Sequence, residues 1–303
     1  MFRAAYFLAL LSVLCITMNA FGKNDELVER ESAIVELIEK IALEENFTIK
    51  NALNNELISL FYDALLADNS FEYPFDSLNN IGNLKSSDNR FRIFTWNIPQ
   101  SGGLQRYFGF IQININGKIE IYPLTDNRKS YEQPHAEIGN SDKWYGALYY
   151  SISDVKVEGE TFYTLLGVEL NNMFSTKRVI EVIHIQNNGE PVFGHPIFKI
   201  KNQTISRVIF EYSSRANMVL KWEKDLNMIV FDHLSPLRPD YIENYQFYVP
   251  DFSFDAFKFV EPYWEYTADI DIRNPQREKP QAPTQAKEFD EPGFIYRSGR
   301  QSN

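Results

Sequence analysis

RVIFEYSSRANMVLKWEKDLNMIVFDHLSPLRPDYIENYQFYVPDFSFDAFKFVEPYW, the stretch Arg207–Trp264, decides the fold class. It holds three apolar runs rich in β-branched and aromatic residues, Val208–Tyr212, Met218–Trp222 and Met228–Phe231, which are typical of β-strands. A connection of five residues separates each run from the next. Because connections this short join only antiparallel neighbours, the sequence predicts a three-stranded meander at the centre of an antiparallel sheet.

Similar runs continue the pattern on both sides of this stretch. Asn116-Gly117 is a strong signal for a two-residue hairpin, and 187–190 (NNGE) marks a second turn. No helical pattern interrupts the runs, which predicts a long antiparallel meander folded as a sandwich, a barrel or a curved sheet. The other predicted strands are Phe91–Ile98, Tyr107–Ile115, Lys118–Leu124, Trp144–Val155, Phe162–Leu170, Lys177–Ile185, Val192–Ile200, Tyr245–Val249, Asp255–Val260 and Trp264–Ile270.

The N-terminal part of the chain has a helical period instead. Residues 24–46 and 51–67 repeat apolar side chains at spacings of three and four, which predicts two amphipathic helices. We expect a helical hairpin that packs on the sheet, with a partner-binding helix pair as the alternative. The fold class is therefore α+β and β-rich. Its predicted parts are a helical hairpin (23–67), an irregular connection (68–90) and an antiparallel β domain (91–272).

The two ends of the chain carry neither pattern. Residues 1–22 have a basic start, a short apolar run from Ala4 to Thr17 and small residues at a cleavage site, which predicts a secretory signal peptide. We therefore expect an exported protein, periplasmic or outside the cell, which does not span a membrane once the leader is removed. The single cysteine, Cys15, lies in this leader, so the mature chain is expected to lack disulfides. Residues 273–303 predict a disordered tail, with Phe294-Ile295-Tyr296 as a short docking point in the alternative.

The excess of acidic over basic residues limits the kinds of partner that the protein can bind. The chain has 30 Lys and Arg against 41 Asp and Glu, a net charge of −11, and removal of the leader takes away only one basic residue, Arg3. A strongly acidic surface repels nucleic-acid phosphates and anionic lipid headgroups. We therefore expect no nucleic-acid binding. An envelope protein or a carbohydrate is the expected partner.

Catalytic candidates lie near the end of the opening stretch. Asp232, His233, Asp251 and Asp255 are the titratable groups there, and a glycosidase needs only two carboxylates several ångströms apart. Asp232 and His233 are adjacent on one strand and face opposite ways, so they cannot form a catalytic triad with Ser235. The alternation in 251–255 resembles a calcium loop, but the glycine and glutamate that such a loop requires are absent, so strand alternation explains it better. No metal or cofactor is predicted.

Aromatic side chains give candidates for ligand binding. Trp96, Trp144, Tyr145 and Trp222 could stack on sugar rings if they are exposed. The alternative is that they fill the core, as aromatic residues in sheets usually do.

Three motifs carry a resemblance to known sequences. They are TWNIPQSGG (Thr95–Gly103), FDHLSP (Phe231–Pro236) and YVPDFSFDAF (Tyr248–Phe257). Here the chain resembles a group of uncharacterised exported proteins of Gram-negative bacteria over about 91–273. Similar sequences suggest Gly where this chain has Phe252, which argues against a tight turn at that position. The resemblance implies no activity.

Two hypotheses for function follow. The first is a non-catalytic, exported binding or assembly protein of the bacterial envelope. The alternative is a glycan-acting hydrolase that uses carboxylates near Asp232, Asp251 and Asp255.

The leader predicts a defined mature N-terminus. N-terminal sequencing of the exported protein should begin at Lys23, because cleavage after Gly22 is the preferred site, with cleavage after Ala20 as the second. An exported chain that still begins at Met1 would contradict the signal-peptide prediction.

Overall fold

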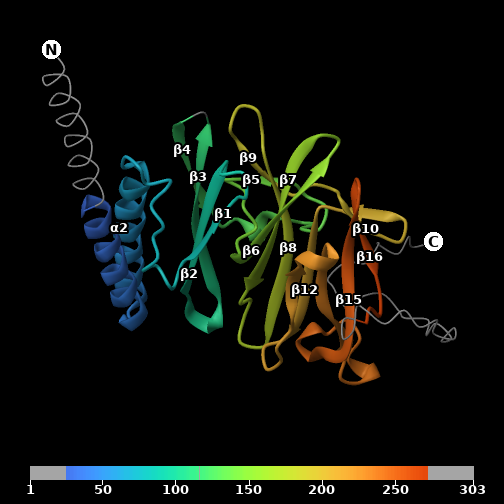
Figure 1. Cartoon of the computed structure of the whole chain (residues 1–303). Helices are drawn as coiled ribbons and strands as arrows, with labels where there is room; N and C mark the ends of the chain where they lie inside the picture. The colour runs from blue at the N-terminus through green and yellow to red at the C-terminus, as the bar shows by residue number, and fades with distance from the viewer. Residues whose placement is uncertain (1–24, 116, 272–303) are drawn as a thin grey trace, which may run out of the picture.

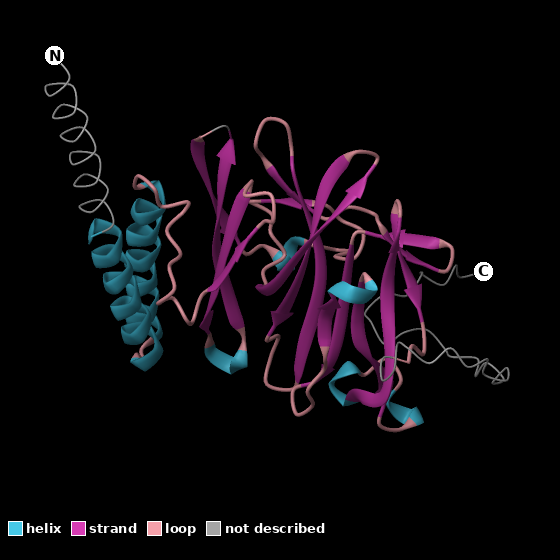
Figure 2. Ribbon diagram, viewed as in Figure 1, coloured by secondary structure: helices cyan, strands magenta, loops and turns pink. Residues whose placement is uncertain are grey.

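Four layers make up the molecule: a pair of helices followed by three stacked β-sheets (Figure 1). The computed structural model describes residues 25–115 and 117–271. The predicted leader with Cys15 and the predicted tail (273–303) lie outside the described residues. Figure 2 shows the helical pair on one side of the strands, as expected for an α+β, β-rich fold. Of the alternatives left open, the sandwich is the one observed, extended to three sheets.

The helical layer contains residues 25–43 and α2 (Phe47–Leu66). α2 begins four residues before its predicted start at position 51 because Asn46 caps it. The Asn46 Oδ1 atom accepts hydrogen bonds from the backbone N of Thr48 (2.9 Å) and Ile49 (3.2 Å). Within the described residues, no helix has the length and apolar character needed to cross a membrane.

We name the sheets by their place in the stack. The helix-side sheet has the order β1 (Gly82–Lys85), β2 (Phe91–Pro99), β3 (Gln105–Ile115), β4 (Lys118–Thr125). The middle sheet has the order β5 (Gly139–Asn140), β9 (Pro191–Phe193), β8 (Ser175–Ile185), β7 (Glu160–Glu169), β6 (Leu148–Val157), and β12 (Arg207–Ser213) also pairs with β8. The outer sheet has the order β11 (Gln203–Ile205), β10 (Phe198–Ile200), β16 (Tyr263–Thr267), β15 (Tyr248–Val260), β14 (Met228–Pro236), β13 (Leu220–Glu223). Short 3₁₀ turns are η1 (Ser101–Gly103), η2 (Arg128–Ser130), η3 (Lys224–Leu226), η4 (Pro239–Tyr241) and η5 (Tyr245–Phe247).

Three apolar cores hold these layers together. On β2, Phe94 packs in the core shared with the helices, whereas Ile93 packs in the core shared with the middle sheet. On β12, Ile209 belongs to the core on the helix side of the middle sheet, and Phe210 to the core on the side of the outer sheet. Since successive strand residues face opposite sides, strands buried on both faces carry the unbroken apolar runs seen in the sequence.

The predicted three-stranded meander is wrong at its first strand. β12 pairs antiparallel with β8 over seven residue pairs, from Arg207↔Glu181 to Ser213↔Ser175, and does not pair with β13. The chain crosses to the outer sheet after β12, where β13 and β14 pair antiparallel as expected. The reason is burial: β12 is apolar on both faces, and within the middle sheet one face packs toward the helix-side sheet and the other toward the outer sheet. β14 then pairs with β15, a single strand where the sequence predicted two, Tyr245–Val249 and Asp255–Val260.

Two other expectations need correction. The predicted strand Val192–Ile200 is two strands, β9 and β10, in different sheets, because Gly194 takes a positive φ of 89° and Pro196 cannot donate a backbone hydrogen bond. The connection 68–90 contains a strand, β1, which pairs with β2. Here Gly82 lies so close to Thr95 that an added Cβ would be 2.8 Å from the Thr95 Oγ1 atom.

A buried ion pair lies at the centre of the middle sheet. Arg207 on β12 and Glu181 on β8 are directly opposite in the register, and both side chains are 0% exposed. The Arg207 Nε atom donates to Glu181 Oε1 at 2.6 Å, and the Tyr149 hydroxyl also donates to this carboxylate. Burial acts to lower the pKa of Arg207, but the charge and hydrogen bond of Glu181, together with Tyr131 and Tyr149, outweigh burial and the pKa is raised. Arg207 therefore stays charged, with Glu181 as its counter-ion.

The same arginine anchors a long connection. Its Nη1 atom donates to the backbone oxygens of Pro134 and Glu137, and the backbone N of Arg207 donates to His135 O at 3.2 Å. The guanidinium also lies 5.0 Å from the ring centroid of Tyr131. Residues 126–143, a polar loop in the sequence, are therefore fixed against the middle sheet.

Breaking this ion pair should be costly. Arg207→Met leaves the Glu181 carboxylate buried without its counter-ion, so we expect the free energy of unfolding to fall by about 3–5 kcal/mol. The measurement is chemical denaturation followed by circular dichroism. The double variant Arg207→Met/Glu181→Leu should recover part of that loss because no buried charge remains.

An exposed pair provides the matched control. Lys199 and Glu265 form an ion pair at 2.8 Å with both side chains about two-fifths exposed. Lys199→Met should change the unfolding free energy far less than Arg207→Met, because solvent screens the exposed pair. If both variants lose the same unfolding free energy, burial does not increase the contribution of the Arg207–Glu181 pair to stability.

Candidate functional site

A β-bulge brings together most of the catalytic candidates. In the β14–β15 ladder, Asp232 pairs with Phe254 and Leu234 with Pro250, so three residues of β15 lie opposite the single residue His233. At the middle of the bulge Phe252 has a φ of 71° and a side chain that is 95% exposed. The sequence argued against a tight turn at Phe252, but the structure has one there. The strict alternation expected for 251–255 is therefore interrupted.

Asp255 is the hub of the cluster at this bulge. Its Oδ2 atom lies 2.7 Å from His233 Nδ1 and accepts a 2.7 Å hydrogen bond from the Tyr266 hydroxyl. Its Oδ1 atom accepts from the backbone N of Asp269 at 3.0 Å. The hydrogen bond that His233 donates to Asp255 raises the pKa of His233, against the lowering effect of burial, and the charges of Asp255, Asp251 and Asp269 add to it.

The other two carboxylates are held by separate groups. Asp251 accepts hydrogen bonds from the Ser235 hydroxyl (2.9 Å) and from the backbone N and hydroxyl of Ser253 (3.1 and 2.7 Å). Burial acts to raise the pKa of Asp251, but these hydrogen bonds outweigh burial and lower it. Asp232 accepts from the backbone N of Val219 at 2.7 Å, and burial raises its pKa.

Hydrogen bonds within the chain thus occupy all three carboxylates. The bulge unites His233 with Asp255 and places Asp251 near enough to influence the histidine. The carboxylate of Asp232 is instead tied to Val219, the residue just before β13. In the part of the chain that the structure describes, no three His, Cys, Asp or Glu side chains gather to hold a metal ion. This arrangement fits a structural cluster better than a general acid and base.

The aromatic candidates lie mainly in the core, contrary to the exposure that ligand stacking would need. Trp96 is buried between α2 and the helix-side sheet, where its Nε1 atom donates to Asn54 Oδ1 at 2.9 Å. Trp144 and Tyr145 are buried between the helix-side and middle sheets. Trp222 is partly buried and contacts Trp264 edge to face. None of the four forms an open stacking platform.

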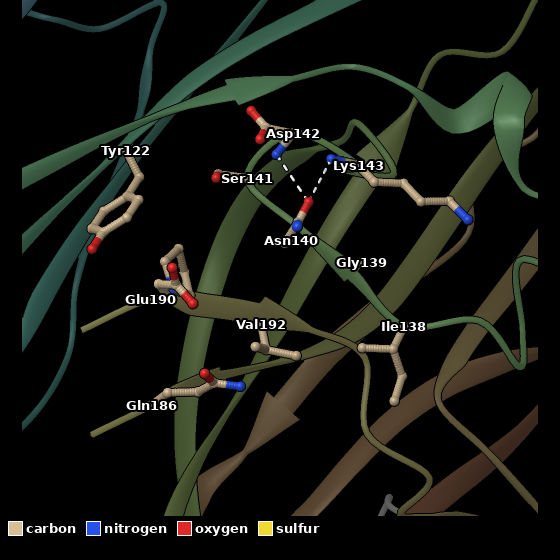
Figure 3. Close-up of a pocket in the computed structure, with 11 residues that line it drawn as sticks. Tyr122, Ile138, Gly139, Asn140, Ser141, Asp142, Lys143, Gln186, Glu190 and Val192 are labelled. Atoms are coloured by element: carbon tan, nitrogen blue, oxygen red, sulfur yellow. Dashed lines mark hydrogen bonds between the residues drawn. The ribbon is translucent and has the colours of Figure 1, made fainter. Parts of the chain in front are cut away.

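A polar pocket lies instead at the edge where the helix-side and middle sheets meet (Figure 3). Its volume of about 460 Å³ is within the range of ligand sites. Tyr122 of β4, the residues around β5 and the β8–β9 hairpin form its wall. The lining residues are Tyr122, Ile138, Gly139, Asn140, Ser141, Asp142, Lys143, Gln186, Glu190, Pro191 and Val192.

Backbone contacts fix the polar wall of this pocket. Asn140 Oδ1 accepts hydrogen bonds from the backbone N of Asp142 (3.1 Å) and of Lys143 (2.8 Å), which closes a tight turn. The Lys143 Nζ atom points away and pairs with Glu137 at 2.7 Å (Figure 3). The Asn140 amide nitrogen therefore remains on the pocket side of the turn.

A second polar hollow of about 560 Å³ adjoins the first through Gln186. Asp88, Arg90, Asn114 and Asn187 are among its lining residues. The β8–β9 hairpin is held in place because Gly189 lies against Ile115, where even a Cβ would clash. The sequence predicted the turn at 187–190, but gave no sign that this hairpin meets residues 138–143.

Comparison with known proteins adds no family. No protein-family model, curated protein or solved structure gives a significant match to the chain. The resemblance to exported proteins of Gram-negative bacteria therefore stays a prediction.

The His233–Asp255 contact predicts a pH-dependent stability. Since the pKa of His233 is raised on folding, its contribution is complete below the unfolded value of about 6.5 and is lost as the pH rises through the raised value. His233→Gln should therefore cost more unfolding free energy at pH values below 6.5 than at alkaline pH. Denaturation curves across that range provide the measurement.

His184 is the matched control because burial lowers its pKa. A partly buried histidine whose pKa is lowered opposes folding as the pH falls, so His184→Gln should show the opposite pH trend. A nuclear magnetic resonance titration should place His233 above 6.5 and His184 below it. If His233 titrates at or below about 6.5, the electrostatic role of Asp255 is wrong.

Proposed function

We propose that the protein is an exported, non-catalytic binding protein of the bacterial envelope, and that it binds a carbohydrate in the pocket beside β4. The observation that carries the proposal is the pocket wall, in which side-chain amides, a hydroxyl and carboxylates from three separate segments converge. Export and the envelope rest on the predicted signal peptide.

The chemistry of the wall suits sugar hydroxyl groups. A hydroxyl both donates and accepts a hydrogen bond, and the amides of Asn140 and Gln186 do the same. The Asp142 and Glu190 carboxylates accept from hydroxyl donors, and Tyr122 offers an aromatic surface at the side of the pocket. The Lys143 ammonium is engaged by Glu137, so the wall does not favour an anionic ligand.

A rigid frame supports binding without chemistry. Arg207 fixes the backbone at Pro134 and Glu137, just before the residues that line the pocket. The hairpin on the other side is held by Ile115. A site whose walls are already in place loses less entropy when a ligand binds, which favours affinity.

Asn140→Asp tests the pocket without removing its turn. The substitution keeps the Oδ atom that accepts from Asp142 N and Lys143 N but replaces the amide donor. In a glycan-array screen followed by calorimetry with the best glycan, we expect binding to weaken roughly tenfold, as for one lost hydrogen bond to the ligand. Asn217→Asp, at an exposed position outside the pocket, makes the same charge change and should bind normally.

The outcome that contradicts the proposal is equally specific. If no glycan binds, or if Asn140→Asp and Asn217→Asp bind the same glycan equally, the pocket is not a carbohydrate site. Gln186→Ala, which removes a second amide from the wall, should weaken binding independently of the turn at Asn140.

One observation keeps the hydrolase as a second candidate. The pKa of Asp232 is raised by burial and that of Asp251 is lowered, and opposite shifts of this kind separate the acid from the base in glycosidases. Incubation with the bound glycan should release no reducing sugar under the binding proposal. Sugar release that is lost in Asp232→Asn would support the hydrolase instead.

A further inference from the structure

Exposed apolar side chains gather at the end of the sheet stack opposite the β8–β9 hairpin. β8 starts at this end and finishes at the hairpin, so the two surfaces are separated by the length of that strand. Three connections form this end: β2–β3, β7–β8 and β12–β13. In Figure 1 the β2–β3 connection and the loops of the outer sheet lie along the lower edge of the molecule. We call the surface of these three connections the loop end.

Direct contacts make the loop end one surface. The Ser214 hydroxyl, between β12 and β13, donates to Met173 O at 2.8 Å, and the Ser214 backbone N donates to Phe174 O at 2.9 Å. From the other side, Gly103 lies so close to Met173 that a Cβ would overlap the Met173 side chain. Residues far apart in the sequence thus present their side chains together.

Large apolar side chains at this end are exposed to solvent. Met173 is 63% exposed, Phe174 is 62% exposed, and Leu104 beside them is also exposed. Contiguous apolar surface is uncommon on a monomer and marks a contact with a partner or a membrane. Val219, in the β12–β13 connection, is a further exposed apolar residue of this end.

The charges at the loop end are unlike those of the whole chain. Between residues 100–106, 170–176 and 213–219 the charged residues are Arg106 and Arg215, both exposed, although the chain carries 41 acidic against 30 basic residues. Among the described residues no carboxylate forms an ion pair with either arginine. The nearby Glu211 accepts a hydrogen bond from Asn171 at 3.1 Å and one from Ser175. The loop end is therefore locally cationic.

We propose that the loop end docks on an anionic lipid surface, with Met173, Phe174 and Leu104 entering the headgroup region and Arg106 and Arg215 contacting lipid phosphates. An interfacial membrane contact uses two features, apolar side chains that enter the lipid and basic side chains that contact its phosphates, and the loop end has both. The negative net charge of the whole chain does not prevent this contact. At ordinary salt, screening limits charge effects to about 8–10 Å, so the charges at the loop end itself decide how it interacts with lipid. This site is independent of the carbohydrate pocket.

Vesicle flotation of the purified protein tests the proposal. The protein should float with vesicles of phosphatidylcholine mixed with phosphatidylglycerol, and bind vesicles of phosphatidylcholine alone more weakly. Met173→Asp/Phe174→Asp should reduce binding to the mixed vesicles by about tenfold or more, since it replaces both apolar groups by charges. Arg215→Ala should reduce it by about fivefold, the effect of one basic residue near an anionic surface.

Val260→Asp is the matched control. Val260 is 48% exposed but ends β15 away from the loop end, so this variant should float like the unchanged protein. Circular dichroism and thermal unfolding confirm that each variant is folded. The proposal is overturned if the protein floats with neither vesicle, or if the double variant and Val260→Asp float equally. A concentration-dependent dimer in size-exclusion chromatography that the double variant abolishes, with no flotation, would also overturn it in favour of self-association.

Discussion

The ion pair between Arg207 and Glu181 is the interaction on which the rest of the middle sheet depends. It joins β12 to β8 at the point where the chain would otherwise have continued into a simple meander. The carboxylate also accepts from the Tyr149 hydroxyl, which in turn accepts from Trp144 Nε1 at 3.0 Å. The Arg207 guanidinium donates hydrogen bonds to the backbone oxygens of Pro134 and Glu137, in the connection that leads to the pocket. A buried charge needs every one of these partners, so one pair fixes a strand, a loop and a pocket wall.

The layered architecture decides where function can lie. The helix-side and middle sheets have apolar side chains on both faces, and each face is covered by another layer. Ligands can therefore reach these two sheets only at strand ends and sheet edges. The polar pocket lies at one end of β8, where the helix-side sheet meets the middle sheet, and the apolar loop end lies at the other. The two surfaces differ because one is rich in hydrogen-bonding groups and the other in exposed apolar side chains beside arginines.

The candidate site shows how far residue patterns can be trusted. Grouping Asp232, His233, Asp251 and Asp255 anticipated a real cluster, since His233 and Asp255 are 2.7 Å apart. The pattern could not show the bulge, because a non-glycine residue with positive φ at Phe252 leaves no signature in the sequence. It also could not show that the carboxylates are occupied by groups such as Val219 N and the Ser253 hydroxyl. Trp96, Trp144 and Tyr145 illustrate the opposite case, since aromatic composition predicts both a core and a binding surface, and burial decides between them.

The sequence by itself determined the helical pair and the antiparallel, β-rich character of the chain, because side-chain periodicity and short turns are local properties. It also located the β3–β4 turn and the β13–β14 pairing, which depend on short connections. Only the tertiary structure decided that β12 belongs with β8, that β9 and β10 lie in different sheets, and that residues around β5 meet the β8–β9 hairpin. These arrangements depend on contacts between distant segments, and in strands that are apolar on both faces the residue pattern does not specify which sheet provides the partner.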